Sequence, residues 1–527
     1  SRRNYLFVGE SIDPNDWQAN VTADQIYQRV IDGVHHEDGH IILLHDAGGS
    51  SRKPTLDALP RIIETLQHEG YQFISLEQYL GMNKQTLMPE INKGKAYYAM
   101  QTNLWLAEMI YHISDFLTAL FLVFLALGMM RLIFMYVLMI REKRAENRRN
   151  YAPIDAATAP TVSIIVPGYN EEVNIVRTIT TLKQQDYPNL HIYFVDDGSK
   201  DHTLERVHEA FDNDDTVTVL AKKNGGKASA LNYGIAACRS EYVVCIDADT
   251  QLKNDAVCRL MKHFIADTEK RVGAVAGNVK VGNQRNMLTY WQAIEYTSSQ
   301  NFDRMAYSNI NAVTVVPGAI GAFRKEVIEE VGGFTTDTLA EDCDLTMSIN
   351  EHGYIIENEN YAVALTEAPE TLRQFVKQRI RWCFGVMQAF WKHRSSLFSP
   401  SKKGFGLWAM PNMLIFQYII PTFSPLADVL MLIGLFTGNA LQIFFYYLIF
   451  LVIDASVSIM AYIFEGERLW VLLWVIPQRF FYRWIMYYVL FKSYLKAIKG
   501  ELQTWGVLKR TGHVQPHPQP LSEGRGE

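Results

Sequence analysis

Two aspartates in the segment "CIDADT" have the spacing of a metal site. Asp247 and Asp249 lie two residues apart at the end of an apolar run, and the two-residue period of a strand turns both carboxylates to one side. Such a pair, without a basic neighbour in sequence, suits a hard cation such as Mg²⁺ that keeps other positions for phosphate oxygens. Pairs of this kind also cap turns, so the interpretation depends on the neighbouring motifs.

Two more motifs could hold a nucleotide. In "FVDDGS", Asp196 and Asp197 alternate across a strand, so one faces a cleft and the other can cap the next helix. In "NGGKASALN", a glycine pair precedes Lys227 at a predicted helix start, where the lysine and free backbone N–H groups could hold a diphosphate. The alternative is a plain turn with a solvated lysine.

The segment "TLAEDCDLT" offers a general base. At helical spacing Glu341 and Asp344 lie near one face and Asp342 points elsewhere, so their pKa values can differ. A general base needs such a separation. Acidic first turns also stabilise the helix dipole, which is the competing explanation.

The motif "QRIRW" lies in a basic and aromatic helical segment at 371–400. Gln378, Arg381 and Trp382 are three and four residues apart and share one face, which presents an amide, a cation and an aromatic platform. This combination suits a sugar ring beside a charged phosphate. The segment is also typical of an amphipathic helix at a membrane surface, and the two interpretations are compatible.

The elements that must position these residues form an α/β domain. From residue 150 to about 370, short strand patterns alternate with helical stretches, which predicts a parallel, helix-covered sheet with ligand sites at the carboxyl ends of its strands. Three of the motifs follow such strand ends. A net charge of -6 over 527 residues gives no sign of nucleic-acid binding.

Apolar blocks on either side predict membrane segments. Residues 116–140 are almost continuously apolar, close to the ~20 residues that cross a bilayer, so we predict a transmembrane helix at 104–141. Arg131 interrupts it and would pair inside a bundle or extend to the interface. The basic segment "REKRAENRR" that follows places the α/β domain in the cytoplasm and the residues before about 100 outside.

The C-terminal part is predicted as transmembrane or channel helices at 404–495, with a cytoplasmic segment and disordered tail at 496–527. Pro411, Pro421 and Pro425 leave the number of crossings open. The five cysteines show no paired spacing and are expected to be reduced thiols. Because the chain begins at Ser1 without a signal peptide, we interpret it as a fragment lacking its true N-terminus.

The ordered motifs PGYNEE, DDGS, NGGKASALN, DADT, GAIGAF, AED and QRIRW resemble the membrane-bound processive glycosyltransferases of family 2, the group of cellulose, chitin, hyaluronan and poly-N-acetylglucosamine synthases. The motifs cover residues 161–382, and the apolar blocks and the segment "WGVLKRTG" extend the likeness to about residue 511. It implies a nucleotide-sugar-binding domain of the GT-A type at 150–370, inverting chemistry, and a channel through which the polymer leaves.

The resemblance also implies residue roles. The uridine and sugar nucleotide would be held by Tyr169, Glu171, Asp196, Asp197, Lys227 and Asp247, and Mg²⁺ or Mn²⁺ by Asp247 and Asp249. Asp342 would deprotonate the acceptor hydroxyl. Acceptor and diphosphate contacts would come from Glu341, Gln378, Arg381 and Trp382, and Gly318 to Phe323 would line the acceptor's approach. Ala340 stands where threonine is more usual, which puts only a secondary contact in doubt.

The segments "VGESIDPNDW" and "IILLHDAGG" resemble the last two motifs of the polysaccharide deacetylases, which implies a partial (β/α) barrel at 1–95. His45 would match the histidine that assists the departing amine, and Asp13 or Asp16 falls in the preceding motif. The metal-binding motifs of that family would lie before Ser1, so we expect no deacetylase activity. His36 and His40 could mimic a metal pair, but a solvated helix end is the favoured interpretation.

Together these expectations describe a bacterial inner-membrane, multi-pass synthase that uses UDP-N-acetylglucosamine to make and export a poly-β-1,6-N-acetylglucosamine-like or chitin-like polymer. The deacetylase fragment suggests the acetylated sugar. Its partners would be the UDP-sugar, the growing polysaccharide, the bilayer and accessory export or deacetylase subunits. Three alternatives stay open: another UDP-sugar such as glucose or a hyaluronan-type donor, a single transfer to a lipid carrier, and a sugar-binding or transport protein.

Overall fold

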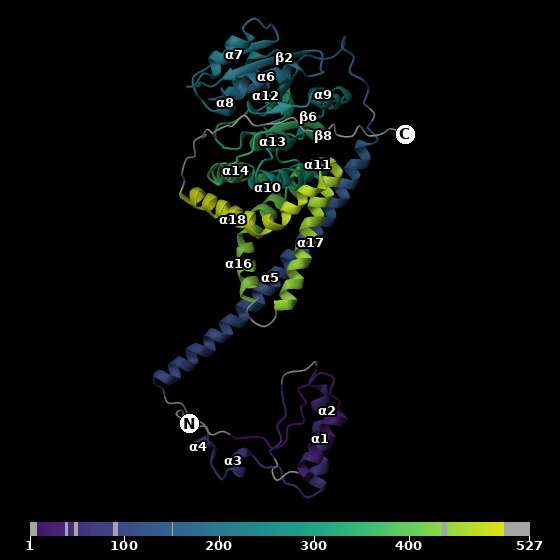
Figure 1. Ribbon diagram of the computed structural model, residues 1–527, viewed down its shortest axis with the longest axis vertical. Coiled ribbons are helices and arrows are strands. Elements are labelled where there is room, and N and C mark those ends of the chain that lie inside the picture. The colour runs from purple at the N-terminus through teal and green to yellow at the C-terminus, as the bar shows by residue number, and fades with distance from the viewer. Residues whose placement is uncertain are drawn as a thin grey trace. The chain divides into compact units, whose positions relative to one another are not determined.

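The computed structural model describes residues 8–36, 41–46, 51–87, 93–149, 151–434 and 440–499. The chain divides into two compact units, Ser1–Thr118 and Ala119–Glu527. Helix α5 (Lys95–Glu146) runs through the division (Figure 1). The predicted segment 104–141 lies inside this helix. Predictions that concern His40 and residues 500–527, including the tail, lie outside the described residues.

The first unit is built on two amphipathic helices, α1 (Ala23–His36) and α2 (Lys53–His68). Their apolar faces share one small core with Ile12, and Ile12 pairs with Ile42 in an isolated parallel bridge. Two short helices follow, α3 (Leu76–Tyr79) and α4 (Lys84–Leu87). Among the described residues this unit has a single bridge and no longer strand, so the partial barrel stays a prediction.

The second unit contains an eight-stranded sheet in the order β3-β2-β1-β4-β7-β6-β8-β5. The strands are β1 (Val162–Gly168), β2 (Leu190–Asp196), β3 (Val217–Ala221), β4 (Tyr242–Cys245), β5 (Gln251–Leu252), β6 (Val272–Val281), β7 (Gly321–Arg324) and β8 (Ile355–Thr366). All seven residues of β1 are buried, as expected for a central strand that helices cover on both faces.

The sheet is mixed, so the prediction of a parallel sheet is correct for only part of it. Strands β1 to β4 are parallel to one another, but β7 runs antiparallel to both β4 and β6. The reason lies in the connection: β7 follows the helical segments at 287–308 and enters the sheet between β4 and β6 in the opposite direction. The expected α/β class is confirmed.

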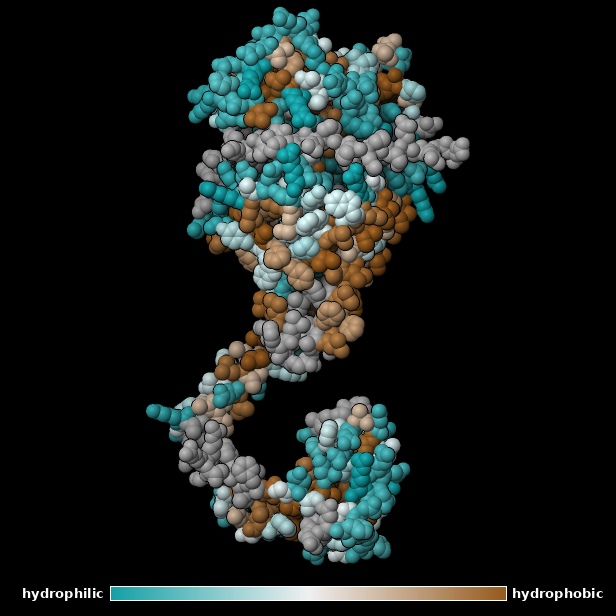
Figure 2. Space-filling model, viewed as in Figure 1, coloured by the Kyte–Doolittle hydropathy of each residue, from teal (hydrophilic) through white to brown (hydrophobic). Residues whose placement is uncertain are grey.

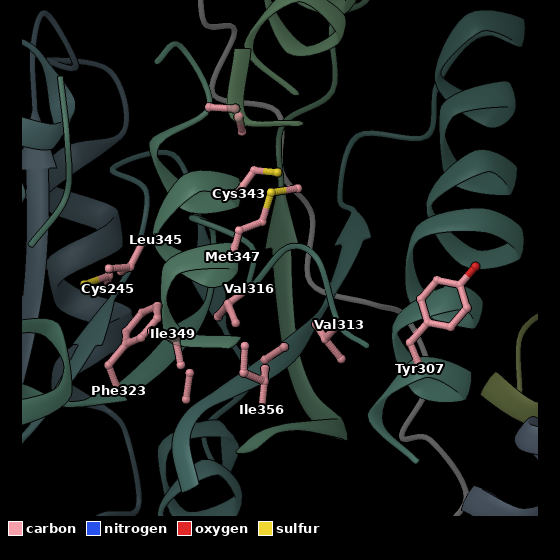
Figure 3. Packing of buried hydrophobic residues seen from close by; sticks show 14 of the residues in the cluster. Cys245, Tyr307, Val313, Val316, Phe323, Cys343, Leu345, Met347, Ile349 and Ile356 are labelled. Atoms are coloured by element: carbon pink, nitrogen blue, oxygen red, sulfur yellow. The ribbon is translucent and has the colours of Figure 1, made fainter. Parts of the chain in front are cut away.

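Helices cover the sheet, and the buried side chains of helices and strands together form the core of the domain. The helices are α6 (Ile175–Lys183), α7 (Thr203–Phe211), α8 (Lys227–Ala237), α9 (Ala256–Ala266), α10 (Met287–Glu295), α11 (Phe302–Ser308), α12 (Lys325–Glu330), α13 (Glu341–Glu351) and α14 (Leu372–Lys392). A π-helical turn, η1 (Tyr296–Asn301), joins α10 to α11. Figure 3 shows the buried side of α13, where Leu345 and Ile349 pack with Phe323 and Ile356.

The described residues between 394 and 499 are mostly helical and expose many apolar side chains. After the short turns η2 (Arg394–Ser396) and η3 (Pro400–Lys402), π-helical segments η4 (Phe405–Ala409) and η5 (Met413–Ile419) flank α15 (Met410–Asn412). Three helices and one turn follow, α16 (Ile420–Gly434), α17 (Ala440–Glu465), η6 (Leu469–Trp474) and α18 (Val475–Lys499). Figure 2 shows hydrophobic residues gathered over these helices and hydrophilic residues over the α/β domain.

Among the described residues, one helix, Tyr97–Glu146, is both long and apolar enough to cross a membrane. Within it Arg131 is paired: its guanidinium donates to Asp303 (2.9 Å) and to Asn412 (2.8 Å). The predicted crossings at 404–495 stay a prediction.

Candidate active site

Most of the predicted site residues line a single cavity of about 350 Å³ at the carboxyl ends of β1 and β4. From the α/β motifs it gathers Tyr169, Glu171, Lys227, Asp247, Asp249 and Gly318. From helices α13 and α14 it gathers Glu341, Asp342, Gln378, Arg381 and Trp382. Residues more than 200 positions apart thus face one space, as the motif order predicted.

Lys227 stands at the centre of the charged part of the cavity. It is the first residue of α8, and its Nζ lies 2.6 Å from Asp247 Oδ1 and 3.0 Å from Glu341 Oε1. Burial alone would lower the pKa of this amine, but the charges of Asp247 and Glu341 outweigh it and raise the pKa. The lysine is therefore a fixed cation that can neutralise a diphosphate.

Asp342 has the environment of a general base. Its Oδ1 accepts a hydrogen bond from its neighbour Cys343 N (2.8 Å), and its Oδ2 accepts one from Gly318 N (3.3 Å). Burial, and then the negative charge of Glu341, raise the pKa of Asp342 to about 6. A carboxylate of this pKa is ionised at neutral pH and accepts a proton more readily than an exposed aspartate.

The absence of a side chain at Gly318 leaves room for the Lys227 ammonium group beside Asp247. A Cβ atom at this position would lie 2.5 Å from Lys227 Nζ and 3.7 Å from Asp247 Oδ1. Gly318 and Ala319 line the cavity, as expected for the segment 318–323. Gly321–Arg324 instead forms β7, and Phe323 is buried in the core (Figure 3), so the predicted acceptor lining is correct only at the start of that segment.

The donor set at the end of β4 fits a divalent cation. Asp247 and Asp249 both line the cavity, and the Asp249 side chain is buried beside Thr250 Oγ1 (3.4 Å). Two carboxylates beside a space large enough for phosphate oxygens form the kind of site that Mg²⁺ or Mn²⁺ occupies. The residues present therefore fit the expected metal.

Asp196 and Asp197 are buried at the end of β2 and do not line the cavity. Asp196 Oδ2 accepts hydrogen bonds from the backbone of Gly198 and Ser199, 3.1 Å each. Asp197 accepts from the backbone N–H of Gly225 (2.9 Å) and Gly226 (2.7 Å). Both carboxylates thus shape the loops before Ser199 and Lys227, and their predicted contact with uridine stays a prediction.

Helix α14 supplies the aromatic platform, and it contains a residue that the sequence analysis missed. The Arg379 guanidinium lies 4.3 Å from the centre of the Trp382 ring, donates to Gln378 Oε1 (2.9 Å) and binds Glu295 (2.7 Å). Arg379 thereby fixes two of the three predicted residues of the motif. Its spacing of three residues from Trp382 was the available signal.

The three carboxylates of α13 are divided differently from the prediction. Glu341 and Asp342 line the cavity, whereas Asp344 is fully buried on the other side and binds His393 and Lys392. Around a helix Glu341 lies between the other two, about 100° from Asp342 and 60° from Asp344. Because Glu341 and Asp342 line the cavity and Asp344 does not, the expected grouping of Glu341 with Asp344 is wrong.

A second group of polar residues lies in the first unit. His45 Nδ1 is 2.8 Å from Asp16 Oδ1, and the Asp16 carboxylate also accepts from Thr55 Oγ1 (2.9 Å). Asp13 is exposed, yet Asp13, Asp16 and His45 can each bring one ligand atom within 4.8 Å of the others. Asp16 is thus the partner of His45. His36 ends α1 as an exposed residue, as expected.

The fold and the cavity define a class: an α/β domain with a lysine, paired aspartates and a buried base at the carboxyl ends of its strands. Residues 163–332 match the family described as glycosyl transferase family 2. This segment is therefore similar to the glycosyltransferases of family 2.

Individual proteins give a more specific similarity than the family does. The chain is 32% identical over 260 residues to the poly-β-1,6-N-acetyl-D-glucosamine synthases of Staphylococcus aureus (strain COL) and of Staphylococcus epidermidis. The match covers 49% of this chain and 61% or 62% of those proteins. Among solved structures, a mannosyltransferase from Pyrobaculum calidifontis with GDP-mannose and Mn²⁺ matches 63% of this chain and 94% of its own, at 25% identity and a TM-score of 0.42.

Proposed function

We propose that this protein is a processive hexosyltransferase that transfers N-acetylglucosamine from UDP-N-acetylglucosamine to the end of a growing β-linked polysaccharide. The observation that carries the proposal is the single cavity in which Lys227, the Asp247–Asp249 pair, the base Asp342 and Trp382 meet. The named relatives, which the chain covers for 61% of their length, support the choice of sugar and a β-1,6 linkage; a chitin-like chain is the alternative polymer.

The reaction follows from the charges of the cavity. Asp342 takes the proton of the acceptor hydroxyl, and the oxygen attacks the anomeric carbon on the face opposite the diphosphate. The bond from that carbon to the diphosphate oxygen breaks, and its electron pair leaves with the diphosphate, so the configuration inverts. Lys227 and Arg381 offset the charge on the departing group. A divalent cation on Asp247 and Asp249 would add positive charge there.

The acceptor is held beside the base. Trp382 lines the cavity and is fixed by Arg379 below its ring, so it can stack on the apolar face of a sugar. If the polymer keeps its end in this cavity after each transfer, the enzyme is processive.

We further propose that the protein lies in a bacterial cytoplasmic membrane through α5 and the C-terminal helices. Long apolar side chains of α5 such as Ile110, Phe116 and Leu122 are exposed, and such a surface needs lipid or a protein partner. The basic end of α5 would place the α/β domain in the cytoplasm and the first unit outside. A channel in the C-terminal helices would export the polymer.

Isolated membranes incubated with labelled UDP-N-acetylglucosamine, UDP-glucose or UDP-glucuronic acid, with Mg²⁺ or Mn²⁺, test the proposal. We expect an aminosugar polymer that a β-1,6-specific glycosaminidase degrades, and a loss of 10²- to 10⁴-fold in Asp342→Asn. Synthesis of a glucose polymer would show that the donor sugar is glucose and not N-acetylglucosamine. Transfer of a single sugar to a lipid would show that the acceptor is a lipid and not a growing polysaccharide. Full activity in Asp342→Asn would refute the assignment of the base.

A further inference from the structure

A polar stretch of helix on the acceptor side of the cavity has no counterpart among the sequence motifs. The π-helical turn η1 and the following helix α11 contribute six residues to the cavity lining: Tyr296, Ser299, Gln300, Asp303, Arg304 and Tyr307. Single π-helical turns inside α-helices occur frequently at functional sites.

Arg304 is the unusual member of this stretch. Its side chain lines the cavity, yet the residue is only 6% exposed, and its Nε has no hydrogen-bond partner in the described structure. One terminal nitrogen donates to Asn301 Oδ1, and Asn301 Nδ2 in turn donates to the carbonyl of Val279 on β6 (3.0 Å). The guanidinium is thus held in place with one buried donor unused, which is costly unless a ligand satisfies it.

Arg304 lines the same cavity as the base Asp342 and the aromatic side chain of Trp382. Burial lowers the pKa of its guanidinium to about 10, and the charges of Glu465 and Asp342 oppose that effect. Tyr296 is also among its electrostatic neighbours, and the Tyr296 ring lies 6.3 Å from the Trp382 ring. Arg304 and Tyr296 therefore face the cavity that also contains the base and the aromatic platform.

The chemistry of the missing partner is restricted. Arginine only donates hydrogen bonds, so the ligand atom must be an acceptor. Seven carboxylates and three cationic side chains line the cavity (Glu171, Asp247, Asp249, Asp303, Glu341, Asp342, Glu367; Lys227, Arg304, Arg381), so an anionic acceptor sugar is disfavoured. A neutral carbonyl oxygen satisfies both conditions, and an N-acetylated aminosugar carries one in its acetamido group.

We propose that Arg304, positioned by Asn301, binds the acetamido carbonyl of the acceptor sugar and selects N-acetylated over de-N-acetylated chain ends. The inference rests on the proposed transfer of N-acetylglucosamine. Removal of the acetyl group leaves an amine, which in its protonated form only donates hydrogen bonds, so it cannot accept one from Arg304. A chain end that has lost its acetyl group would then be a poor acceptor.

The experiment compares two acceptors that differ in one group. The full-length protein in detergent is given UDP-N-acetylglucosamine and either an N-acetylated oligosaccharide or the same oligosaccharide de-N-acetylated, and kcat/KM for each acceptor is measured. A charge-assisted hydrogen bond predicts that the wild type prefers the N-acetylated acceptor roughly ten- to hundredfold. In Arg304→Gln we expect a preference of no more than about threefold, with KM for UDP-N-acetylglucosamine changed less than the acceptor KM.

Ser298→Ala is the matched control, because Ser298 lies in the same π-helical turn, donates to the carbonyl of Ile294 and does not line the cavity. It should leave the acceptor preference unchanged. A tenfold preference that survives in Arg304→Gln overturns the inference, as does equal use of both acceptors by the wild type.

If Arg304→Gln does not fold, Arg304→Lys carries the test, because it keeps a positive charge and loses the planar guanidinium donors. A preference as large as that of the wild type in this variant contradicts the role of Arg304. Failure of the proposed function looks different: the wild type would then transfer N-acetylglucosamine to neither acceptor.

Discussion

At the scale of single residues, the basicity of Asp342 results from opposing contacts. Burial and the adjacent charge of Glu341 raise the pKa of the carboxyl group, whereas Lys227 and the Cys343 N–H lower it. The balance lies at about pH 6, so the group is ionised at neutral pH and still accepts a proton from a sugar hydroxyl.

This balance predicts the acid side of the pH profile. Because Asp342 must be ionised to act, kcat should fall about tenfold per pH unit below pH 6. In Glu341→Gln the like charge is gone, the pKa of Asp342 should fall, and the acid limb should move to lower pH. The rate of polymer synthesis, measured between pH 4.5 and 8, gives the pH at which activity falls on the acid side of the profile.

The same variant loses a partner of Lys227, so its absolute rate is expected to drop as well, and the position of the limb is the decisive quantity. Gln378→Glu, which adds a carboxylate to the cavity lining, is the opposite perturbation and should move the limb upward. An acid limb at the same pH in the wild type and in Glu341→Gln would contradict the assigned cause of the raised pKa.

The site residues that could be predicted from the sequence are those that stand in short motifs. Lys227, Asp247, Asp342 and Trp382 stand in short motifs at the ends of predicted elements, and all line the cavity. Arg304 has no such signal, because its importance comes from burial against β6 and from an unused donor, both of which arise only in the folded chain.

At the scale of elements, a buried clamp joins the helix of the base to the helix of the aromatic platform. His393, after the end of α14, places Nε2 3.0 Å from Asp344 Oδ1 and Nδ1 2.8 Å from Glu351 Oε2, both on α13. Lys392 adds a contact to Asp344 at 2.9 Å. The position of Asp342 relative to Trp382 depends on this junction.

The contacts of His393 with Asp344 and Glu351 predict that the free energy of unfolding depends on pH. Burial lowers the pKa of His393, but hydrogen bonds to Asp344 and Glu351 outweigh it and raise the pKa from 6.5 to about 9. A raised pKa contributes stability that is complete below pH 6.5 and is lost as the pH rises through 9, on the order of 3 kcal/mol. His393→Gln should therefore lower the melting temperature by roughly 5 °C at pH 7.

The difference between the wild type and His393→Gln should shrink at pH 10, where the wild-type imidazole is neutral. His352→Gln serves as the control, since His352 is exposed at the end of α13 and bonds only a carbonyl of its own helix among the contacts described. A gap in melting temperature that is the same at pH 7 and pH 10 would show that the histidine acts through packing and not through its charge.

A close approach between α14 and the start of α13 gives the second prediction at this scale. A Cβ atom at Gly385 would lie 2.7 Å from Ala340 N and 2.8 Å from the carbonyl carbon of Leu339, both backbone atoms. Gly385→Ala should therefore destabilise the protein by about 1–3 kcal/mol and reduce polymer synthesis more than tenfold, because the Glu341–Asp342 turn must shift.

Thermal unfolding and polymer synthesis measured together test this. Gly128→Ala on α5, where no atom lies within 4 Å of the added Cβ, should leave both unchanged. Normal activity in Gly385→Ala would mean that the two helices tolerate separation. The small residue at Ala340, where the resembled family more often has threonine, agrees with this tight junction.

Element types were easier to predict than element directions. The apolar runs at 162–168, 190–196 and 242–245 form strands as expected, since short buried runs between helices are typical of strands. The antiparallel course of β7 had no signal in its four residues, because strand direction is set by how the preceding helices return the chain to the sheet.

At the scale of the whole molecule, the cavity belongs entirely to the second unit. Every residue that lines it lies between Pro167 and Gln417, while the Asp16–His45 pair lies in the first unit. The chemistry proposed for the synthase therefore makes no use of the segment that resembles a deacetylase.

The last prediction separates the two units by mutation in the full-length protein. Asp16→Ala removes the acceptor of three groups, the His45 ring, the His45 backbone N–H and the Thr55 hydroxyl, and should destabilise the first unit by about 1–3 kcal/mol. Polymer synthesis should stay within about twofold of the wild type, and acetate release from chitooligosaccharides should be undetectable in both, with or without zinc. Zinc-dependent acetate release by the wild type that His45→Ala abolishes would contradict this, because it would show that Asp13, Asp16 and His45 form a working metal site.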